Sequence, residues 1–185
     1  MILDGLLLFT GTSNGASSGI TASAYTDAPT TGTQVASNVI DLGVDSGVPS
    51  SANGGGARDI GAGDNPSLEL LANVTVAFAG GTDLYLLLAG APDNGSGAAG
   101  SYTTMWQSPL VLLADLDIGA QLANITVPRP AVGQVLPRFL RLSFISTGTH
   151  TAGQVQAAIV LDRADQVQGP GSVMSGYPAG ITVAN

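Results

Sequence analysis

The sequence contains no cysteine and no lysine, and it has one histidine among 185 residues. Without cysteine there is no disulfide framework, no thiol nucleophile and no zinc–thiolate site. Five arginines supply all of the positive charge against thirteen acidic residues, which gives a formal net charge of -8. Because phosphate binding needs clustered basic groups, this balance argues against a nucleic-acid-binding protein.

Charged residues of either sign are also scarce, at 10% of the chain against about 25% in typical globular domains. That is too few for a coiled coil or a helical bundle, whereas the 44% of hydrophobic residues argue against a wholly disordered chain. No basic N-terminal segment precedes a long apolar run, so we expect neither a secretory signal nor a membrane span. The length fits one domain, which we place at residues 1–165, with a Gly/Ser/Pro-rich loop at 44–56 and an extended tail at 166–185.

Alternating apolar and polar residues predict an all-β protein. The glycines and aspartate at 80–83 predict a turn, and with it a hairpin of the strands on either side. No window carries a helical stripe; the best helix candidate, 109–122, begins with proline and contains glycine. We therefore expect an antiparallel jelly roll or β-sandwich with Gly/Ser-rich loops at 11–19, 44–56 and 92–100. The expected strands are 74–78, 84–88, one or two within 102–114 around Pro109, 125–127, 140–144 and 155–161, with weaker candidates at 3–10, 20–25 and 39–42.

Two glycine motifs match enzyme patterns by composition only. Residues 15–19 fit the G-x-S-x-G nucleophile elbow with Ser17, and His150 follows later, but no helix is expected after the serine. His150 lies in a Ser/Thr/Gly segment, which we interpret as a surface loop. Residues 95–100 fit G-x-G-x-x-G, but the chain continues as a strand instead of the helix that a dinucleotide site needs.

The remaining polar residues do not form a recognisable catalytic or metal site. Asp115 and Asp117 alternate as calcium ligands can, but the other oxygen ligands are missing, so solvated acids at a strand end are the simpler interpretation. Aromatic residues are few and scattered, which favours core or interface packing over a sugar-binding platform. We expect no catalysis, no metal and no cofactor. The arginines are natural ion-pair anchors, within the fold or across a contact: Arg58, Arg129, Arg138, Arg141 and Arg163.

Several ordered segments resemble the capsid cement (decoration) proteins of tailed phages of the Bordetella-phage type. Together these segments cover about a quarter of the chain. The segments are Met1–Phe9, Asn38–Gly43, Ala57–Gly63, Leu136–Leu142 and Thr151–Arg163.

This resemblance implies a jelly-roll fold without catalysis on the outside of an icosahedral phage head. It implies that the protein clamps neighbouring major capsid protein subunits and associates with itself as a homodimer. The chain departs from the family in the loop 44–56, which looks like an insertion, and in the tail beyond Arg163, which looks like an addition, so a homotrimer is the alternative. Neither nucleic acid nor a membrane is an expected partner. The net charge of -8 fits the exterior of the head better than the DNA-filled interior.

We expect the subunit or capsid contacts at three places. The first is the apolar N-terminal segment, with Leu3, Leu6 and Leu8. The second is the charge pair Arg58 and Asp59, which follows a glycine run. The third is Arg138 and Arg141. The alternatives are an adhesin module that binds host glycan or protein, a hydrolase using Ser17 and His150, and a secreted surface-layer module.

Overall fold

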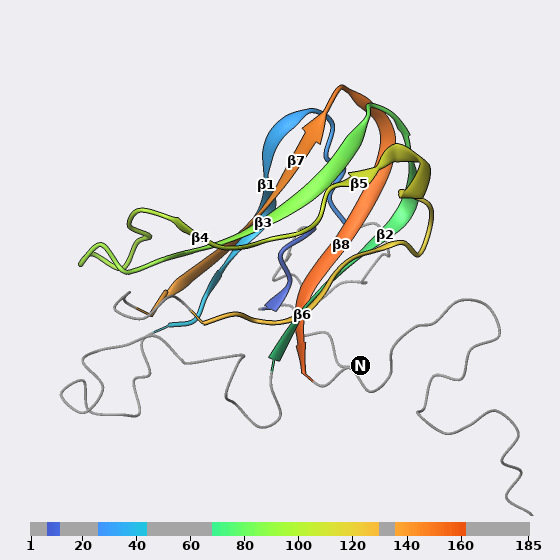
Figure 1. Cartoon of the computed structure of the whole chain (residues 1–185). Helices are drawn as coiled ribbons and strands as arrows, with labels where there is room; N and C mark the ends of the chain where they lie inside the picture. The colour runs from blue at the N-terminus through green and yellow to red at the C-terminus, as the bar shows by residue number, and fades with distance from the viewer. Residues whose placement is uncertain (1–6, 12–25, 44–67, 130–135, 162–185) are drawn as a thin grey trace, which may run out of the picture.

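The computed structural model describes residues 7–11, 26–43, 68–129 and 136–161, which form two antiparallel β-sheets (Figure 1). The larger sheet has the order β1-β7-β3-β4, with β5 also paired to β3; the smaller has the order β6-β2-β8. Within these residues the helical structure is one short 3-10 turn, η3 (Leu113–Asp115). The strands are β1 (Gly32–Asp41), β2 (Leu68–Gly80), β3 (Asp83–Ala91), β4 (Thr103–Gln107), β5 (Val111–Leu112), β6 (Gln121–Thr126), β7 (Phe139–Thr147) and β8 (His150–Leu161).

The hydrophobic core lies between the two sheets. Alternate residues of each strand point inward, as the period of two requires. Leu84, Leu86 and Leu88 of β3 are fully buried, and they share one cluster with Leu70 and Val74 of β2. Each leucine buried in this way stabilises the fold by about 1.5–3 kcal/mol. The predicted antiparallel β-sandwich is therefore confirmed.

Most predicted strands are present, and they are longer than the apolar alternation indicated. The expected strands at 74–78, 84–88, 125–127, 140–144 and 155–161 overlap β2, β3, β6, β7 and β8. Residues 102–114 hold β4 and β5 on either side of Pro109, both at the edge of their sheet, as expected for proline. The candidate strand 20–25, the loop 44–56 and the tail 166–185 lie outside the described residues.

The predicted hairpin of β2 and β3 is wrong. β2 pairs with β6 and β8, whereas β3 pairs with β4, β5 and β7, so the turn at 81–82 carries the chain from one sheet to the other. The connection from β7 to β8 crosses between the sheets in the same way, beside the first turn: the Thr82 N–H donates to the Thr147 carbonyl at 2.8 Å. A turn signal predicts where the chain reverses direction. It does not predict whether the two flanking strands pair with each other or with strands of two different sheets.

His150 lies between these two crossing turns and is only 3% exposed, so the expected surface position is wrong. Its Nδ1 is 3.0 Å from the Gly80 carbonyl oxygen and its Nε2 is 3.1 Å from that of Asp83. The Phe78 ring packs against the imidazole in an edge-to-face arrangement, with 4.9 Å between the ring centroids. Gly81 has φ +67°, and a Cβ there would lie 2.5 Å from the imidazole, so only glycine fits this close approach.

A short N-terminal segment, residues 8–10, covers the outer edge of β8. The Phe9 N–H donates to the Ala157 carbonyl at 2.9 Å, and the Ala157 N–H donates to the Thr10 hydroxyl oxygen at 2.9 Å. The Phe9 carbonyl in turn accepts the Asn38 N–H at 2.8 Å, which links the segment to β1 of the other sheet. The segment therefore joins the two sheets along one open side and protects an edge that could otherwise pair with another chain.

Candidate interaction surface

The outer face of the five-stranded sheet is not covered by any other strand of the described residues. Residues paired across neighbouring strands lie on the same face. Because the alternate residues of β1, β3 and β7 are in the core, the outward residues follow from the register. Successive rows across the sheet are Thr33–Ile145–Tyr85, Val35–Ser143–Leu87–Gln107 and Val39–Arg141–Ala89–Thr104. We call these eleven residues the sheet face.

The sheet face is unusual in its lack of charge. Val35 and Val39 of β1 are 50% and 45% exposed, and Leu87 and Ile145 on the inner strands are half-buried. A solvent-facing antiparallel sheet ordinarily alternates apolar inward with polar outward. Within these eleven positions the side chains are mostly aliphatic or small, and Arg141 is the single charged residue. The next outward positions beyond the three rows hold a carboxylate at each end, Asp41 on β1 and Asp83 on β3. Ser143 and Ala89 within this face are buried, whereas its residues on β1 and β4 are exposed. A partly exposed, weakly polar face of this kind is typical of a protein–protein contact.

Arg141 lies in the row of the sheet face that is nearest to the start of β7. Its guanidinium carbon is 3.9 Å from the centroid of the Tyr102 ring, a cation–π contact that holds both side chains against the sheet. The Arg141 Nε atom is buried without a hydrogen-bond partner. Burial raises the pKa of the Tyr102 hydroxyl, and the positive charge of Arg141 opposes this shift. The pair places a fixed cation and the Tyr102 ring beside an otherwise uncharged set of side chains.

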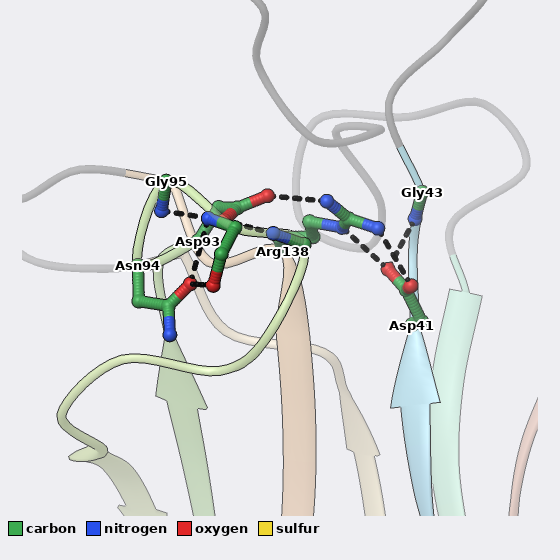
Figure 2. A network of polar contacts seen from close by, with 8 residues as sticks. Asp41, Gly43, Asp93, Asn94, Gly95 and Arg138 are labelled. Carbon is green, nitrogen blue, oxygen red and sulfur yellow. Dashed lines mark hydrogen bonds and ion pairs between the residues drawn. The ribbon is translucent and has the colours of Figure 1, made fainter.

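Arg138 borders the sheet face at the end where β7 begins (Figure 2). Its Nε donates to Asp41 Oδ1 and its Nη2 to Asp41 Oδ2, each at 2.9 Å, so the guanidinium grips the end of β1 with two parallel bonds. Its Nη1 donates to Asp93 Oδ2, which belongs to the connection after β3. Arg138 therefore ties three segments of the larger sheet together, and this network is an ion-pair anchor within the fold.

The two aspartates of this network differ in what lowers their pKa values. For Asp41 the main cause is the hydrogen bond from Arg138, with a further contribution from the Gly43 N–H. For Asp93 the main cause is the Gly95 N–H, followed by the Gly97 N–H, with Arg138 contributing less. The carboxylates in return raise the pKa of Arg138. Both carboxylates are held in their charged form, as pairing and N–H donors require.

Residues 92–100 form a projecting arm between β3 and β4, which extends away from the sandwich in Figure 1. The expected loop is folded back on itself, because Asp93 Oδ1 accepts the N–H groups of Gly95 and Gly97 at 2.7 and 3.0 Å. The Asn94 N–H donates to the Ala98 carbonyl at 2.9 Å. After the arm the chain continues as β4, so the strand expected there is confirmed.

The structure places three of the seven expected contact residues. Arg138 and Arg141 lie at and on the sheet face, whereas Leu8 is 2% exposed and packs inside the chain with Leu71, Ala158 and Val160. The Leu8 side chain therefore does not face solvent, since the segment that carries it is used to close the edge of β8. Leu3, Leu6, Arg58 and Asp59 lie outside the described residues, and their contacts stay predictions.

The sequence reasoning missed the aliphatic part of the sheet face, namely Val35, Val39, Leu87 and Ile145. Val35 and Val39 were the sequence signal that could have indicated this face. Each alternates with polar neighbours, but alternation alone does not say whether such a valine faces the core or the outside. β1 contains a bulge between them, where the register with β7 shifts, and this breaks the simple alternation. Only the strand order shows that these four side chains share one face.

The structure describes the candidate catalytic and metal-binding residues only in part. Ser17 lies outside the described residues, and both ring nitrogens of His150 are occupied by backbone carbonyls. Asp115 and Asp117 are exposed on either side of buried Leu116. Among the described residues, no three His, Asp or Glu side chains are grouped so that they could hold a metal ion.

The fold and this surface define an antiparallel β-sandwich that presents an almost uncharged sheet face to its surroundings. The chain belongs to the Bbp16 family, a family of Bordetella phage proteins, whose pattern matches residues 21–159, three quarters of the sequence. The match runs from before β1 into β8 and so includes every strand that forms the sheet face. No curated protein matches the chain. In the part of the chain described by the structure, no helix is long and apolar enough to cross a membrane.

Proposed function

We propose that this protein is a phage capsid cement protein, which binds the outer surface of the head and stabilises contacts between major capsid protein subunits. The observation that carries the proposal is the sheet face, an ordered and almost uncharged surface in a protein of a phage family. Binding that occurs only to the assembled shell stabilises that shell by mass action, and the effect repeats at every symmetry-related seam.

The charge of the protein favours a location on the outer surface of the phage head over one in its DNA-filled interior. A net charge of -8 without any lysine opposes contact with packaged DNA. The few fixed cations of the described chain are already engaged, Arg138 with two aspartates and Arg141 with Tyr102. Such a surface suits a role that needs apolar contact area and no chemistry, which agrees with the proposal that the protein is not an enzyme.

The main alternative, a glycan-binding adhesin, has no specific support in the structure. Sugar sites commonly present exposed aromatic rings, but the exposed large hydrophobic side chains of the described residues are all aliphatic. A screen against a glycan array tests this alternative directly, and we expect no binding.

The proposal is tested with phage heads that lack the protein. Adding the purified protein should raise the temperature at which the heads release DNA. Val35→Asp places an uncompensated charge on the sheet face and should abolish this effect, because a charge buried in a contact without a partner is strongly unfavourable. Thr126→Asp, at an exposed position of β6 in the other sheet, is the matched control and should act as the wild type. Heads unaffected by the wild-type protein would contradict the proposal.

A further inference from the structure

The connection that contains β5 and η3 exposes three large aliphatic side chains within nine residues. Leu110 and Leu112 are each 53% exposed and Ile118 is 72% exposed. Val111, between the two leucines, is half-buried and packs against the core, so both leucines point away from it. These three are among only seven large hydrophobic residues that are exposed in the described chain, so the exposure is concentrated here.

This connection is fixed to both sheets. Leu116 is fully buried in the core, and the Leu113 N–H donates to the Thr82 carbonyl at 2.9 Å. The Phe78 N–H donates to the Leu116 carbonyl at 3.0 Å, and the Gly119 N–H donates to that of Val74 at 2.8 Å. Figure 1 shows the connection passing from β5 beside β3 across to β2. The aliphatic side chains are therefore presented on a pre-organised backbone, which lowers the entropy lost on binding.

Two acidic residues share this connection. Asp115 and Asp117 are exposed, and neither carboxylate has an ion-pair or hydrogen-bond partner among the described residues. The sequence has no basic residue between Arg58 and Arg129. We call Leu110, Leu112, Asp115, Asp117 and Ile118 the acidic aliphatic patch. Its negative charge is not neutralised by neighbouring sequence.

The acidic aliphatic patch is continuous with the sheet face. Leu112 is paired with Asp83, one step beyond the row that contains Tyr85, at the end of the sheet away from Arg138. Paired residues lie on the same side of a sheet, so Leu112 extends the outer face toward η3. One partner can therefore contact the sheet face and the acidic aliphatic patch at the same time.

We infer that the acidic aliphatic patch docks against a basic protein surface with an apolar centre, and that this contact fixes the orientation of the protein on its partner. A second copy of this chain is a poor occupant, because it also carries a charge of -8 and its Arg138 and Arg141 are engaged. Nucleic acid and anionic lipid are repelled by the same carboxylates. The inference rests on the proposed function for the partner's identity, which is then the major capsid protein.

The test measures binding to purified heads that lack the protein, at low and at high salt. The double variant Asp115→Asn with Asp117→Asn should bind about tenfold more weakly at low salt, and its affinity should change less with salt than that of the wild type. Leu112→Ser with Ile118→Ser should weaken binding by about tenfold at both salt concentrations. Glu69→Gln, on β2, removes one acidic charge outside the patch and should bind as the wild type.

The outcomes separate this inference from the proposed function. Wild-type protein that binds heads, with both double variants equally tight, overturns the inference and leaves the cement function standing. Wild-type protein that binds no heads overturns both. Circular dichroism and thermal unfolding of each variant confirm that the exposed substitutions leave the fold intact.

Discussion

At the scale of single residues, Arg138 has the most defined role in the described structure. Its guanidinium binds two carboxylates that are distant in sequence, Asp41 at the end of β1 and Asp93 just after β3. The ion pair is partly exposed, so we expect it to add little to the free energy of unfolding and to act mainly by fixing the positions of the segments it joins. It holds the base of the arm and the end of β1 in one position beside the sheet face.

The first prediction concerns the substitution Arg138→Gln. The pKa of Asp41 should rise toward the ordinary value, because the Arg138 hydrogen bond is the main cause of its lowering. The pKa of Asp93 should rise less, because the Gly95 and Gly97 N–H donors remain. Carbon NMR of the carboxyl groups during a pH titration measures both. Arg141→Gln is the control, and equal shifts of Asp41 and Asp93 would show that the assignment of causes is wrong.

The same network makes stability depend on pH in a defined direction. A carboxylate whose pKa is lowered by folding stabilises the fold above its ordinary pKa of about 3.9, and this contribution is lost as the pH falls through the lowered value. In Arg138→Gln this pH-dependent contribution should therefore be smaller, and its loss should be complete at a higher pH than in the wild type. Thermal unfolding recorded between neutral pH and about pH 3 follows this change.

At the scale of elements, side-chain hydroxyls accept hydrogen bonds from backbone N–H groups at positions where no neighbouring strand does so. On β8 the Thr10 hydroxyl oxygen accepts the Ala157 N–H at 2.9 Å. On β3 the Ser108 hydroxyl oxygen accepts the Leu86 N–H at 2.9 Å, where Pro109 separates β4 from β5. In both places a buried backbone donor has an acceptor although no regular strand continues beside it, as buried polar groups require.

The second prediction tests this role with Thr10→Val, which keeps the shape and removes the hydroxyl. The free energy of unfolding should fall by about 1–3 kcal/mol, because the buried Ala157 N–H loses its acceptor. Thr75→Val is the matched control, since that hydroxyl only donates to the Gln154 carbonyl, at 3.3 Å, and should cost less than about 1 kcal/mol. Denaturant unfolding of both variants measures the difference, and equal losses would contradict the account of β8.

The strands also show which parts of the fold could be predicted from the sequence. Alternation in 84–88 and 140–144 identified strands of the core, because burial on one face leaves a period of two. The sheet to which each strand belongs was not predictable, as β2 and β3 show, because pairing depends on contacts distant in sequence. Arg138 could be identified as an ion-pair anchor from the scarcity of cations, but Asp41 and Asp93 as its partners depend on the register of β1, β7 and β3.

At the scale of the whole molecule, two features act together. The sheet face offers almost uncharged area around one fixed cation, Arg141, and the acidic aliphatic patch adds negative charge at the end opposite Arg138. Apolar area contributes affinity, whereas charge steers approach and fixes register. A protein with this arrangement is suited to hold one orientation on a shell that repeats the same site many times.

The most direct test of the central claim is a cryo-EM map of phage heads with the protein bound. The account predicts density for the sandwich on the outside of the shell, with the sheet face toward the major capsid protein. Density inside the head, or a sandwich that faces the shell only with the β6-β2-β8 sheet, would contradict it.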